Sequence, residues 1–388
     1  MTDIFAKDKQ FVANTYARFS INIVSGKGSV AVDNNGKEYI DMGSGIGVTS
    51  FGFCDDEWVK AVTKQLGTLQ HTSNLYYTNP CADLAEALCN KTGFKKVFFS
   101  NSGAESNECA IKVARKYAAL KKGSDYYTII TLNNSFHGRT LTTLAATGQD
   151  VFHKDFTPLT EGFVHTPAND FAALEKLATS TKTAAIMIEC VQGEGGVNAL
   201  DFDFVKQTAE LCKKNDIILI VDEVQTGNGR TGKMYAYEHF GIMPDIVTTA
   251  KGLGGGLPIG ATLLNVKVEN VLGFSDHGST FGGNPIASAG ALSIVNRIDN
   301  KLLDAVNEKS KYIFSELKNA KGVKSVSGMG LMIGIETEKP AKEIVNKCIE
   351  NGVLCLTAKT KVRLLPALNI PFDTLKKAVE IIKNACEC

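Results

Sequence analysis

Short apolar, β-branched runs alternate with helical stretches through most of the chain, and this alternation is the strongest constraint on its fold. The runs that we predict to be strands are 97–99, 127–132, 184–188, 217–221, 246–249 and 261–264. They are too short for typical helices and are rich in valine, isoleucine and threonine. Strands that alternate with helices favour a mostly parallel, doubly wound sheet that is covered on both faces. We therefore predict an α/β fold.

The two ends of the chain have a different pattern. Residues 16–50 contain short β-type runs separated by glycine- and asparagine-rich turns, which indicates a small antiparallel meander. Helical stretches follow near 56–67 and 80–91. Beyond residue 290 we expect a long helix and then an α+β arrangement with strands near 322–326, 332–336, 353–356 and 362–365 and a closing helix from Phe372.

Composition limits the classes of function. The 388 residues carry a net charge of +1, so the chain has no basic field that would favour binding to nucleic acid or to an anionic membrane. We find no signal peptide, no transit peptide and no apolar run that could span a bilayer. The ten cysteines include no CxxC pair, which fits a reducing cytosol. For the CxC formed by Cys386 and Cys388 we favour an exposed, frayed tail over a metal site.

The segment FSNSGAES, residues 99–106, lies between an expected strand and an expected helix. Ser102 followed by Glu105 is typical of a capping box, which begins a helix without any ligand. A helix N-terminus with Gly103 beside it can also hold a phosphate through free N–H groups and the helix dipole. Because the segment matches neither a P-loop nor a dinucleotide motif, we expect a mononucleotide-like phosphate rather than ATP or NAD. This motif alone leaves both interpretations open.

An acid and an amine follow two of the predicted strands. Asp222 and Glu223 come directly after 217–221, and Lys251 comes shortly after 246–249. Ligands bind outside the carboxyl ends of the strands in open α/β sheets, so the two kinds of group are candidates for one site. A partly desolvated lysine has a lowered pKa and can attack an aldehyde. The alternative is a lysine that merely extends its amine to solvent.

The segment NSFHGR, residues 134–139, follows another strand. Phe136 is suited to stack on a flat ring, and Arg139 can bind a carboxylate. Taken alone, Phe136 is more typical of a core and Arg139 of a surface ion pair. His137 is a candidate general base, although Gly138 favours a tight turn that only places it.

Three further segments carry polar groups or glycines. Glu189 and Glu194 follow the strand at 184–188, which indicates acid–base chemistry rather than metal binding because no histidine stands at ligand spacing. Arg363 lies in an apolar run and needs either an internal acid or a substrate carboxylate. The glycine-rich loop at 278–285 says little by itself.

The combination narrows the choice. Pyridoxal phosphate needs a lysine for a Schiff base, an acid for its pyridine nitrogen, a phosphate anchor and a ring platform. Lys251, Asp222, the segment 102–104 and Phe136 supply these four in chemical type. The sequence therefore predicts a site for this cofactor, with no metal.

Seven motifs together resemble the class III pyridoxal-phosphate aminotransferases of fold type I, over nearly the whole chain. They occur in the family's order and are NSGAESNE, FHGRT, ECVQGEGG, DEVQTGNGRTG, AKGLGGGLPIGA, STFGGNP and VRLLP. The resemblance implies a large domain with a mostly parallel seven-stranded sheet and a smaller α+β domain. We expect residues 1–55 to contribute to the small domain, 56–290 to form the cofactor-binding domain and 291–388 to form the rest of the small domain.

The resemblance also implies roles around the cofactor. Lys251 would form the Schiff base and carry the proton, Asp222 would bind the pyridine nitrogen and Gln225 the phenolic oxygen. Phe136 would stack on the ring. The phosphate would be held by Ser102, Gly103 and Ala104, and by Thr280 from the neighbouring subunit of a homodimer.

Substrate binding would fall to three charged residues. Arg139 and Arg363 would bind carboxylates, and Glu194 would be a switch acid that pairs with Arg363 when the amino donor binds and frees it for 2-oxoglutarate or glutamate. His137 is then positional and not a base. Two departures, Cys190 in place of a proline and Gly52-Phe53 in place of Gly-His, touch none of the residues assigned to chemistry.

The implied reaction is transfer of the terminal amino group of N-acetylornithine to 2-oxoglutarate, giving N-acetylglutamate 5-semialdehyde and glutamate in arginine biosynthesis, by a cytosolic homodimer. An alternative donor is ornithine, 4-aminobutyrate or succinyl-diaminopimelate, because such preferences depend on a few pocket contacts. A non-catalytic protein that binds a phosphate ligand on this fold is the alternative from another class. Loss of Lys251 or Asp222 would indicate it, and both are present.

Overall fold

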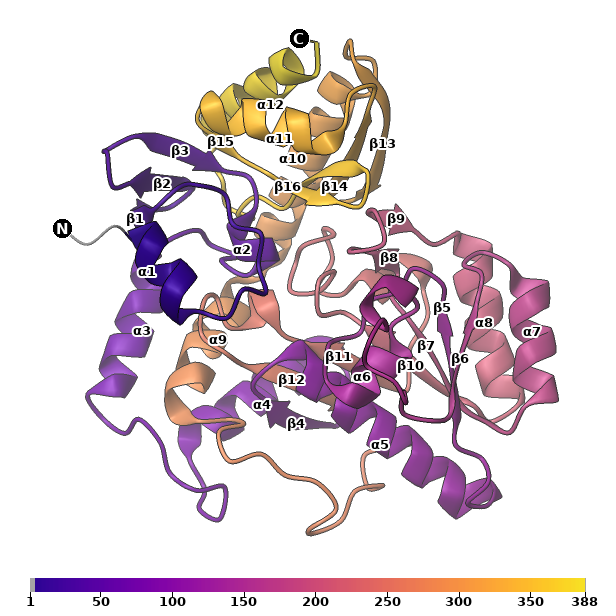
Figure 1. Cartoon of the computed structure of the whole chain (residues 1–388). Coiled ribbons are helices and arrows are strands. Elements are labelled where there is room, and N and C mark those ends of the chain that lie inside the picture. Colours follow the sequence, from indigo (N-terminus) through magenta and orange to yellow (C-terminus); the bar gives the residue numbers. More distant parts are fainter. Residues whose placement is uncertain (1–3, 388) are drawn as a thin grey trace.

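The computed structural model describes residues 4–387 and is built around one large sheet (Figure 1). Its strand order is β4-β12-β11-β10-β7-β5-β6. The bounds are β4 (Lys96–Ser100), β5 (Thr128–Leu132), β6 (Phe163–Thr166), β7 (Thr183–Ile188), β10 (Ile218–Asp222), β11 (Ile246–Thr249) and β12 (Gly260–Leu264). Only β12 runs antiparallel to its neighbours in this sheet. The predicted seven-stranded, mostly parallel sheet is confirmed, although β6, a short edge strand, was not predicted from the sequence.

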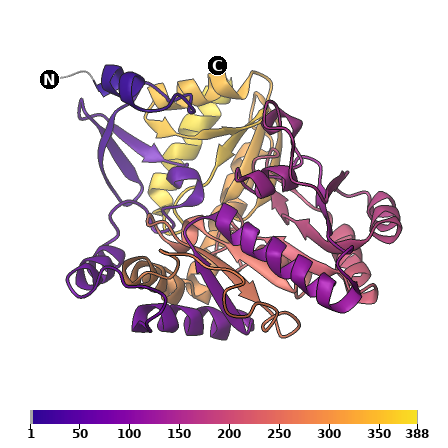
Figure 2. The same cartoon turned by 60° about the horizontal axis from the view of Figure 1, so that its bottom comes forward.

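Helices cover both faces of this sheet. They are α3 (Asp56–Leu66), α4 (Asn79–Thr92), α5 (Gly103–Lys122), α6 (Leu141–Ala146), α7 (Phe171–Ser180), α8 (Phe202–Lys214) and α9 (Pro285–Arg297). Figure 2 shows α5 lying across one face. Side chains alternate along β10, so Ile218 and Ile220 join the core under α5, whereas Leu219 and Val221 join the larger core on the opposite face. This double burial explains why the strands are apolar throughout.

The N-terminal and C-terminal parts of the chain meet in a second region, at the top of Figure 1. The predicted meander is confirmed as β1 (Ile23–Lys27), β2 (Val30–Asp33) and β3 (Glu38–Asp41). β15 (Val353–Leu354) pairs with β3 in parallel and so joins the two ends of the chain. Before the meander lies α1 (Ile4–Phe11), and after it comes α2 (Ser44–Gly47), a single turn whose four residues all have positive φ.

The remaining C-terminal strands form a four-stranded antiparallel sheet of order β13-β14-β17-β16. Their bounds are β13 (Val323–Met329), β14 (Met332–Thr337), β16 (Leu356–Ala358) and β17 (Lys361–Leu364). The associated helices are α10 (Asn300–Leu317), α11 (Ala341–Glu350) and α12 (Phe372–Glu387). A separate hydrophobic core unites these elements, apart from β16, with β15. A two-stranded ribbon, β8 (Val191–Gln192) and β9 (Asn198–Ala199), lies beside the large sheet.

Two sequence predictions for the C-terminal part are wrong. The expected long helix is two helices, α9 and α10, because the chain breaks at Ile298 and Asp299 accepts a hydrogen bond from the backbone N–H of Leu302 to cap α10. The expected exposed tail is instead part of α12, where Cys386 is buried; Cys388 lies outside the described residues. The helix α11 was missed, although Ala341, Ile344, Val345 and Cys348 bury one face of it at helical spacing.

The domain boundary that we predict at residue 290 lies inside α9. Buried residues of α9, such as Ala291 and Ile294, join the core of the large sheet. Buried residues of α10, such as Val306 and Ile313, join the small-domain core. Because α9 belongs to one core and α10 to the other, we propose that the boundary between the two domains lies at Ile298. Within residues 4–387, no helix combines the length and apolar character needed to cross a membrane.

Candidate active site

A cavity of about 440 Å³ opens where strands of the large sheet end. Most of the residues predicted for the cofactor and one predicted for substrate line it: Ser102, Gly103, Ala104, Phe136, Arg139, Asp222, Gln225 and Lys251. They come from four segments of the chain, spread over residues 102–251. The topology brings them together because they follow strands whose carboxyl ends share one edge of the sheet.

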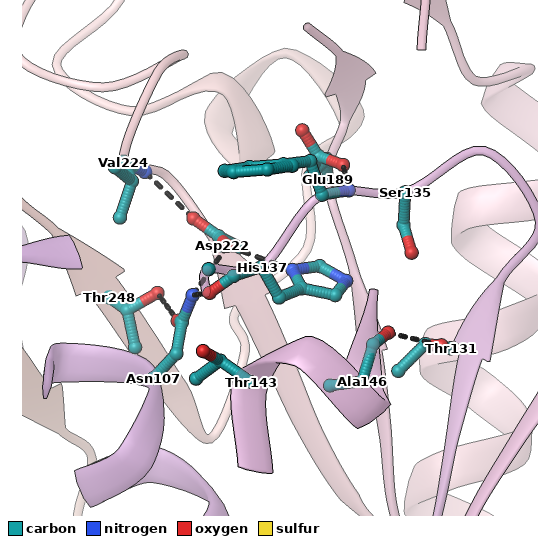
Figure 3. A network of polar contacts seen from close by, with 12 residues as sticks. Asn107, Thr131, Ser135, His137, Thr143, Ala146, Glu189, Asp222, Val224 and Thr248 are labelled. Carbon is teal, nitrogen blue, oxygen red and sulfur yellow. Dashed lines mark hydrogen bonds and ion pairs between the residues drawn. The ribbon is translucent and has the colours of Figure 1, made fainter. Parts of the chain in front are cut away.

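Asp222, the last residue of β10, is held by three donors. Its Oδ2 lies 2.8 Å from Nδ1 of His137 and accepts a 2.8 Å hydrogen bond from Nδ2 of Asn107. Its Oδ1 accepts a 3.0 Å hydrogen bond from the backbone N–H of Val224. Thr248 in turn donates to Oδ1 of Asn107 over 2.6 Å, which fixes the amide orientation (Figure 3). This network fixes the direction of the Asp222 carboxylate.

The neighbouring acid, Glu223, does not line the cavity. Its carboxylate accepts hydrogen bonds from Oγ1 of Thr226 at 2.5 Å and from the backbone N–H of Tyr237 at 2.9 Å. Successive side chains of a strand point to opposite faces, so the Asp222-Glu223 pair is divided between the site and the core. Of these two acids, only Asp222 lines the cavity.

Lys251 follows β11 and has a φ of +45°, a left-handed conformation that is rare for a residue with a side chain. The strand end beside it is fixed, because Nδ2 of Asn228 donates to Oγ1 of Thr249 at 2.8 Å and to the carbonyl of Ala250 at 3.3 Å. No acceptor within residues 4–387 receives a hydrogen bond from the Lys251 amine. Burial lowers the pKa of Lys251, although Glu194 and Asp222 oppose that shift. The amine is therefore suited to nucleophilic attack.

The N-terminus of α5 is capped and still has donors to spare. Oγ of Ser102 accepts a 3.2 Å hydrogen bond from the backbone N–H of Glu105, whose carboxylate accepts from Oγ of Ser102 and the backbone N–H of Asn101, both at 2.9 Å. The backbone N–H groups of Gly103 and Ala104 have no acceptor among residues 4–387. The capping and phosphate interpretations are thus compatible, because the cap leaves two N–H groups at the cavity wall free.

An ion pair lies beside the cavity and joins the two regions of the chain. NH1 of Arg363, on β17, lies 2.5 Å from Oε1 of Glu194 and 3.1 Å from Oε1 of Gln225. Nε2 of Gln225 also donates to Oε1 of Glu194 at 3.2 Å. Burial raises the pKa of Glu194, but the charge and hydrogen bond of Arg363 outweigh it and hold that pKa below its usual value. Nε of the buried Arg363 has no partner within the described residues, so this guanidinium retains capacity to bind.

Phe136 and Arg139 do not have the structural roles that their types most often take. Phe136 lines the cavity and packs edge-on against Phe152 with ring centroids 5.7 Å apart. The exposed Arg139 guanidinium lies 4.6 Å from the Phe152 ring centroid, and no acid within residues 4–387 forms an ion pair with it. A cation at the mouth of a cavity without an acidic partner is available for an anionic ligand.

Thr280 lies apart from the other predicted residues. It is exposed, and with His71, Asn74 and Ser279 it lines a separate surface groove. Nδ2 of Asn101, beside the α5 N-terminus, donates to Oγ of Ser279 at 3.2 Å. The loop that carries Thr280 is therefore attached near the cavity without entering it.

Sequence reasoning missed the role of Asn107 and left Glu189 without a specific one. Asn107 lies on the buried face of α5 with Ala110 and Ala114. A buried amide needs hydrogen-bond partners, so an asparagine on an apolar helix face was the sign in the sequence of a polar contact there. Glu189 is 5% exposed and lines the cavity. The partner of His137 could not be read from the sequence, since Asp222 is 85 residues away.

Comparison with known proteins identifies the family. The model of the family described as aminotransferase class-III matches residues 11–386. The acetylornithine aminotransferase of Haemophilus ducreyi is 50% identical over 97% of this chain and 96% of its own. The acetylornithine aminotransferase of Methanocaldococcus jannaschii is 46% identical over 98% and 96%.

Solved structures agree. The ornithine aminotransferase of Toxoplasma gondii superposes with a TM-score of 0.95 at 33% identity, over 99% of this chain and 94% of that one. Another structure of that enzyme, with a TM-score of 0.94, has PLP at partial occupancy in its active site. The N-acetylornithine aminotransferase of Stenotrophomonas maltophilia gives a TM-score of 0.85 at 33% identity, with 98% of both chains covered. This chain belongs to the class-III aminotransferase family.

Proposed function

We propose that this chain is a pyridoxal-phosphate-dependent aminotransferase that transfers the terminal amino group of N-acetylornithine to 2-oxoglutarate. The products are N-acetylglutamate 5-semialdehyde and glutamate, a step of arginine biosynthesis, which we assign to the cytoplasm. The observation that carries the reaction type is the convergence of the Lys251 amine, the Asp222 carboxylate and the free N–H groups of α5 on one cavity. The donor is supported by identity of 42–50% to several acetylornithine aminotransferases over nearly the whole chain.

The groups that line the cavity fit pyridoxal phosphate. When bound, this cofactor supplies an aldehyde and an electron-accepting ring. The phosphate is assigned to the free N–H groups of Gly103 and Ala104 together with Oγ of Ser102. Asp222 would keep the pyridine nitrogen protonated, Gln225 would donate to the phenolic oxygen, and Phe136 would supply the platform for the ring.

Lys251 performs the proton transfers. A lysine with an ordinary pKa would hold its proton at neutral pH, whereas burial here lowers that pKa. Nζ of Lys251 can therefore accept the proton from the amine-bearing carbon of the substrate and return it on the other side of the transfer. The charges of Glu194 and Asp222, which oppose the shift, keep the pKa from falling further.

Two arginines and one acid select the substrates. N-acetylornithine presents one carboxylate, for which the unpaired Arg139 is the binding group. 2-Oxoglutarate presents two, so the second needs Arg363, which Glu194 occupies in this structure. Glu194 therefore pairs with Arg363 while the amino donor is bound and moves aside for the dicarboxylate.

We also propose a homodimer in which Thr280 completes the partner's phosphate site. The proposal is supported by exposed apolar side chains on two loops near the groove that Thr280 lines: Leu75, Tyr76, Tyr77, Phe274 and Phe281. Apolar surface of this kind is typical of an interface between subunits. Thr280 is exposed on a loop that is attached beside its own cavity, so its side chain is free to reach the cavity of a neighbouring subunit.

Borohydride reduction of the purified, cofactor-loaded enzyme tests the reaction type. We expect a covalent cofactor adduct on Lys251, detected by peptide mass spectrometry, and none in Lys251→Ala. Absence of an adduct on the unmodified chain would support a non-catalytic phosphate-binding protein instead.

Steady-state kinetics test the donor. We expect a higher kcat/KM for N-acetylornithine than for ornithine, 4-aminobutyrate or succinyl-diaminopimelate. Ornithine is the main competitor, because the Toxoplasma gondii ornithine aminotransferase has the same fold with a TM-score of 0.95. A higher kcat/KM for ornithine would overturn the donor while leaving the reaction type intact.

A further inference from the structure

Glu189 is a buried acid at the cavity for which the reaction described above has no use. It follows β7 directly and is 5% exposed. Its Oε1 accepts a 2.8 Å hydrogen bond from the backbone N–H of Phe136, and its Oε2 accepts a 3.3 Å hydrogen bond from the backbone N–H of Gly193. Figure 3 shows it beside the Asp222–His137 pair. Each carboxylate oxygen therefore holds a different loop.

The two loops held by Glu189 have separate tasks in the proposed function. One carries Phe136, the platform for the cofactor ring. The other begins at Gly193 and carries Glu194, the acid that pairs with Arg363. Gly193 lies so close to Gln225 that an added Cβ would come within 2.5 Å of the Gln225 amide. Small displacements at Gly193 thus reach both partners of Arg363.

We propose that Glu189 is a positioning residue that fixes the Glu194 loop relative to the ring platform and so sets the balance between amino donor and dicarboxylate at Arg363. The proposal rests on the proposed switch of Glu194. It assigns Glu189 no contact with substrate and no proton transfer; its role is carried by the two backbone N–H groups.

A carboxylate suits this role and an amide does not. Both oxygens of Glu189 accept, whereas a glutamine offers one acceptor and one NH2 group that would face a second N–H. The shorter contact to Phe136 is the one we expect Glu189→Gln to keep, leaving the N–H of Gly193 unpaired. The ring platform would stay in place while the Glu194 loop loosens. Pairing of Glu194 with Arg363 would then weaken, which disfavours the amino donor specifically.

Glu223→Gln is a matched control. Glu223 is also a buried acid that accepts one backbone N–H, but its contacts are with Thr226 and Tyr237 and it does not line the cavity. Both side chains are almost fully buried, with Glu189 5% and Glu223 0% exposed. The two variants therefore make the same chemical change at sites of similar burial, and a general effect on stability should appear in both.

The first measurement is hydrogen exchange of the holoenzyme followed by mass spectrometry. In Glu189→Gln we expect faster exchange in the peptide that contains Gly193 and unchanged exchange in the peptide that contains Phe136. Glu223→Gln should leave both peptides unchanged. Unchanged exchange at Gly193 in Glu189→Gln would overturn the proposal.

The second measurement compares the two half-reactions by single-turnover spectroscopy. For Glu189→Gln we expect the apparent dissociation constant of the amino donor to rise by about fivefold or more relative to that of glutamate, the effect of losing about one hydrogen bond. The ratio in Glu223→Gln should equal that of the unmodified enzyme. Equal effects of Glu189→Gln on both half-reactions would overturn the proposal. If the unmodified enzyme prefers another donor, the donor assignment fails, and the same ratio measured with that donor still tests Glu189.

Discussion

Nδ1 of His137 lies 2.8 Å from Oδ2 of Asp222, and the side chains are 0% and 5% exposed. The pair is further supported by Asn107, whose amide donates to the same oxygen. A histidine in this arrangement serves the carboxylate as a hydrogen-bond donor. The acid that we assign to the cofactor nitrogen is therefore held by residues from α5 and from the loop after β5.

Removing His137 should weaken cofactor binding. His137→Ala takes away one of three donors to Asp222, and a hydrogen bond to a charged group contributes about 1.5 to 3 kcal/mol. We expect the dissociation constant of pyridoxal phosphate to rise by roughly tenfold or more, measured by fluorescence titration of the apoenzyme. His239→Ala, outside the cavity, is the control; equal affinities in the two variants would contradict the role of His137.

Gly103 should tolerate replacement by alanine only if Val224 is also replaced by a smaller residue. A Cβ at this position would lie 2.6 Å from Cγ1 of Val224, so Gly103→Ala must displace the α5 N-terminus or the segment after Asp222. We expect Gly103→Ala to lower the melting temperature and the cofactor affinity. The double variant Gly103→Ala/Val224→Ala should recover part of both losses. A double variant that is worse than either single variant would show that close packing of these two residues is not the cause.

Shortening Arg363 should harm binding of the dicarboxylate. Its NH1 contacts both Glu194 and Gln225, and a lysine cannot offer the planar pair of N–H groups with which a guanidinium binds a carboxylate. For Arg363→Lys we expect kcat/KM for 2-oxoglutarate to fall by roughly ten- to a hundredfold. The equivalent change at a surface ion pair, Arg18→Lys, should leave it unchanged. Retention of the full kcat/KM in Arg363→Lys would assign the second carboxylate to another residue.

Stability should depend on pH through Glu223. Burial raises its pKa from 4.5 to about 7 in the folded protein, so the folded state keeps a proton that the unfolded chain has released. This contribution to stability is fully present below the unfolded pKa and is lost as pH rises through the folded pKa. The loss amounts to roughly 3 kcal/mol.

Glu223→Gln cannot ionise, so its stability should not follow this change. Relative to the unmodified chain it should be least stable near pH 4.5, the unfolded pKa, and should match or exceed the unmodified chain above the folded pKa of about 7. Urea unfolding at several pH values between the two pKa values and above provides the measurement. A difference in unfolding free energy that does not change with pH would contradict the raised pKa of Glu223.

Strand ends were predicted well from the sequence because their signals are local. The apolar run before Asp222 and the run before Lys251 each required a buried strand, and the carboxyl ends of such strands share an edge. The first turn of α5 was equally readable from Ser102, Gly103 and Glu105. These local patterns account for most of the cavity wall.

Other features depend on contacts between distant segments and had no local signal. The division of Asp222 and Glu223 between cavity and core follows from strand direction. The pairing of Arg363 with Glu194 spans 169 residues, and the family resemblance predicted it where no local pattern did. The edge strand β6 pairs on one side only, and its four residues carry little apolar pattern. Each of these features depends on where a segment lies in the fold, and a single sequence does not give that position.

Pairing between β3 and β15 places a constraint on how the protein is made. Lys37, next to β3, donates a hydrogen bond to the carbonyl of Glu350, 313 residues later in the chain. During synthesis on the ribosome the meander forms first, but the edge of β3 stays unpaired until Val353, 313 residues after its partner Ile40, has emerged. An unpaired strand edge is a site of aggregation. The yield of folded protein should therefore depend on chaperones or on a low expression temperature more than it does for a protein whose first strands pair locally.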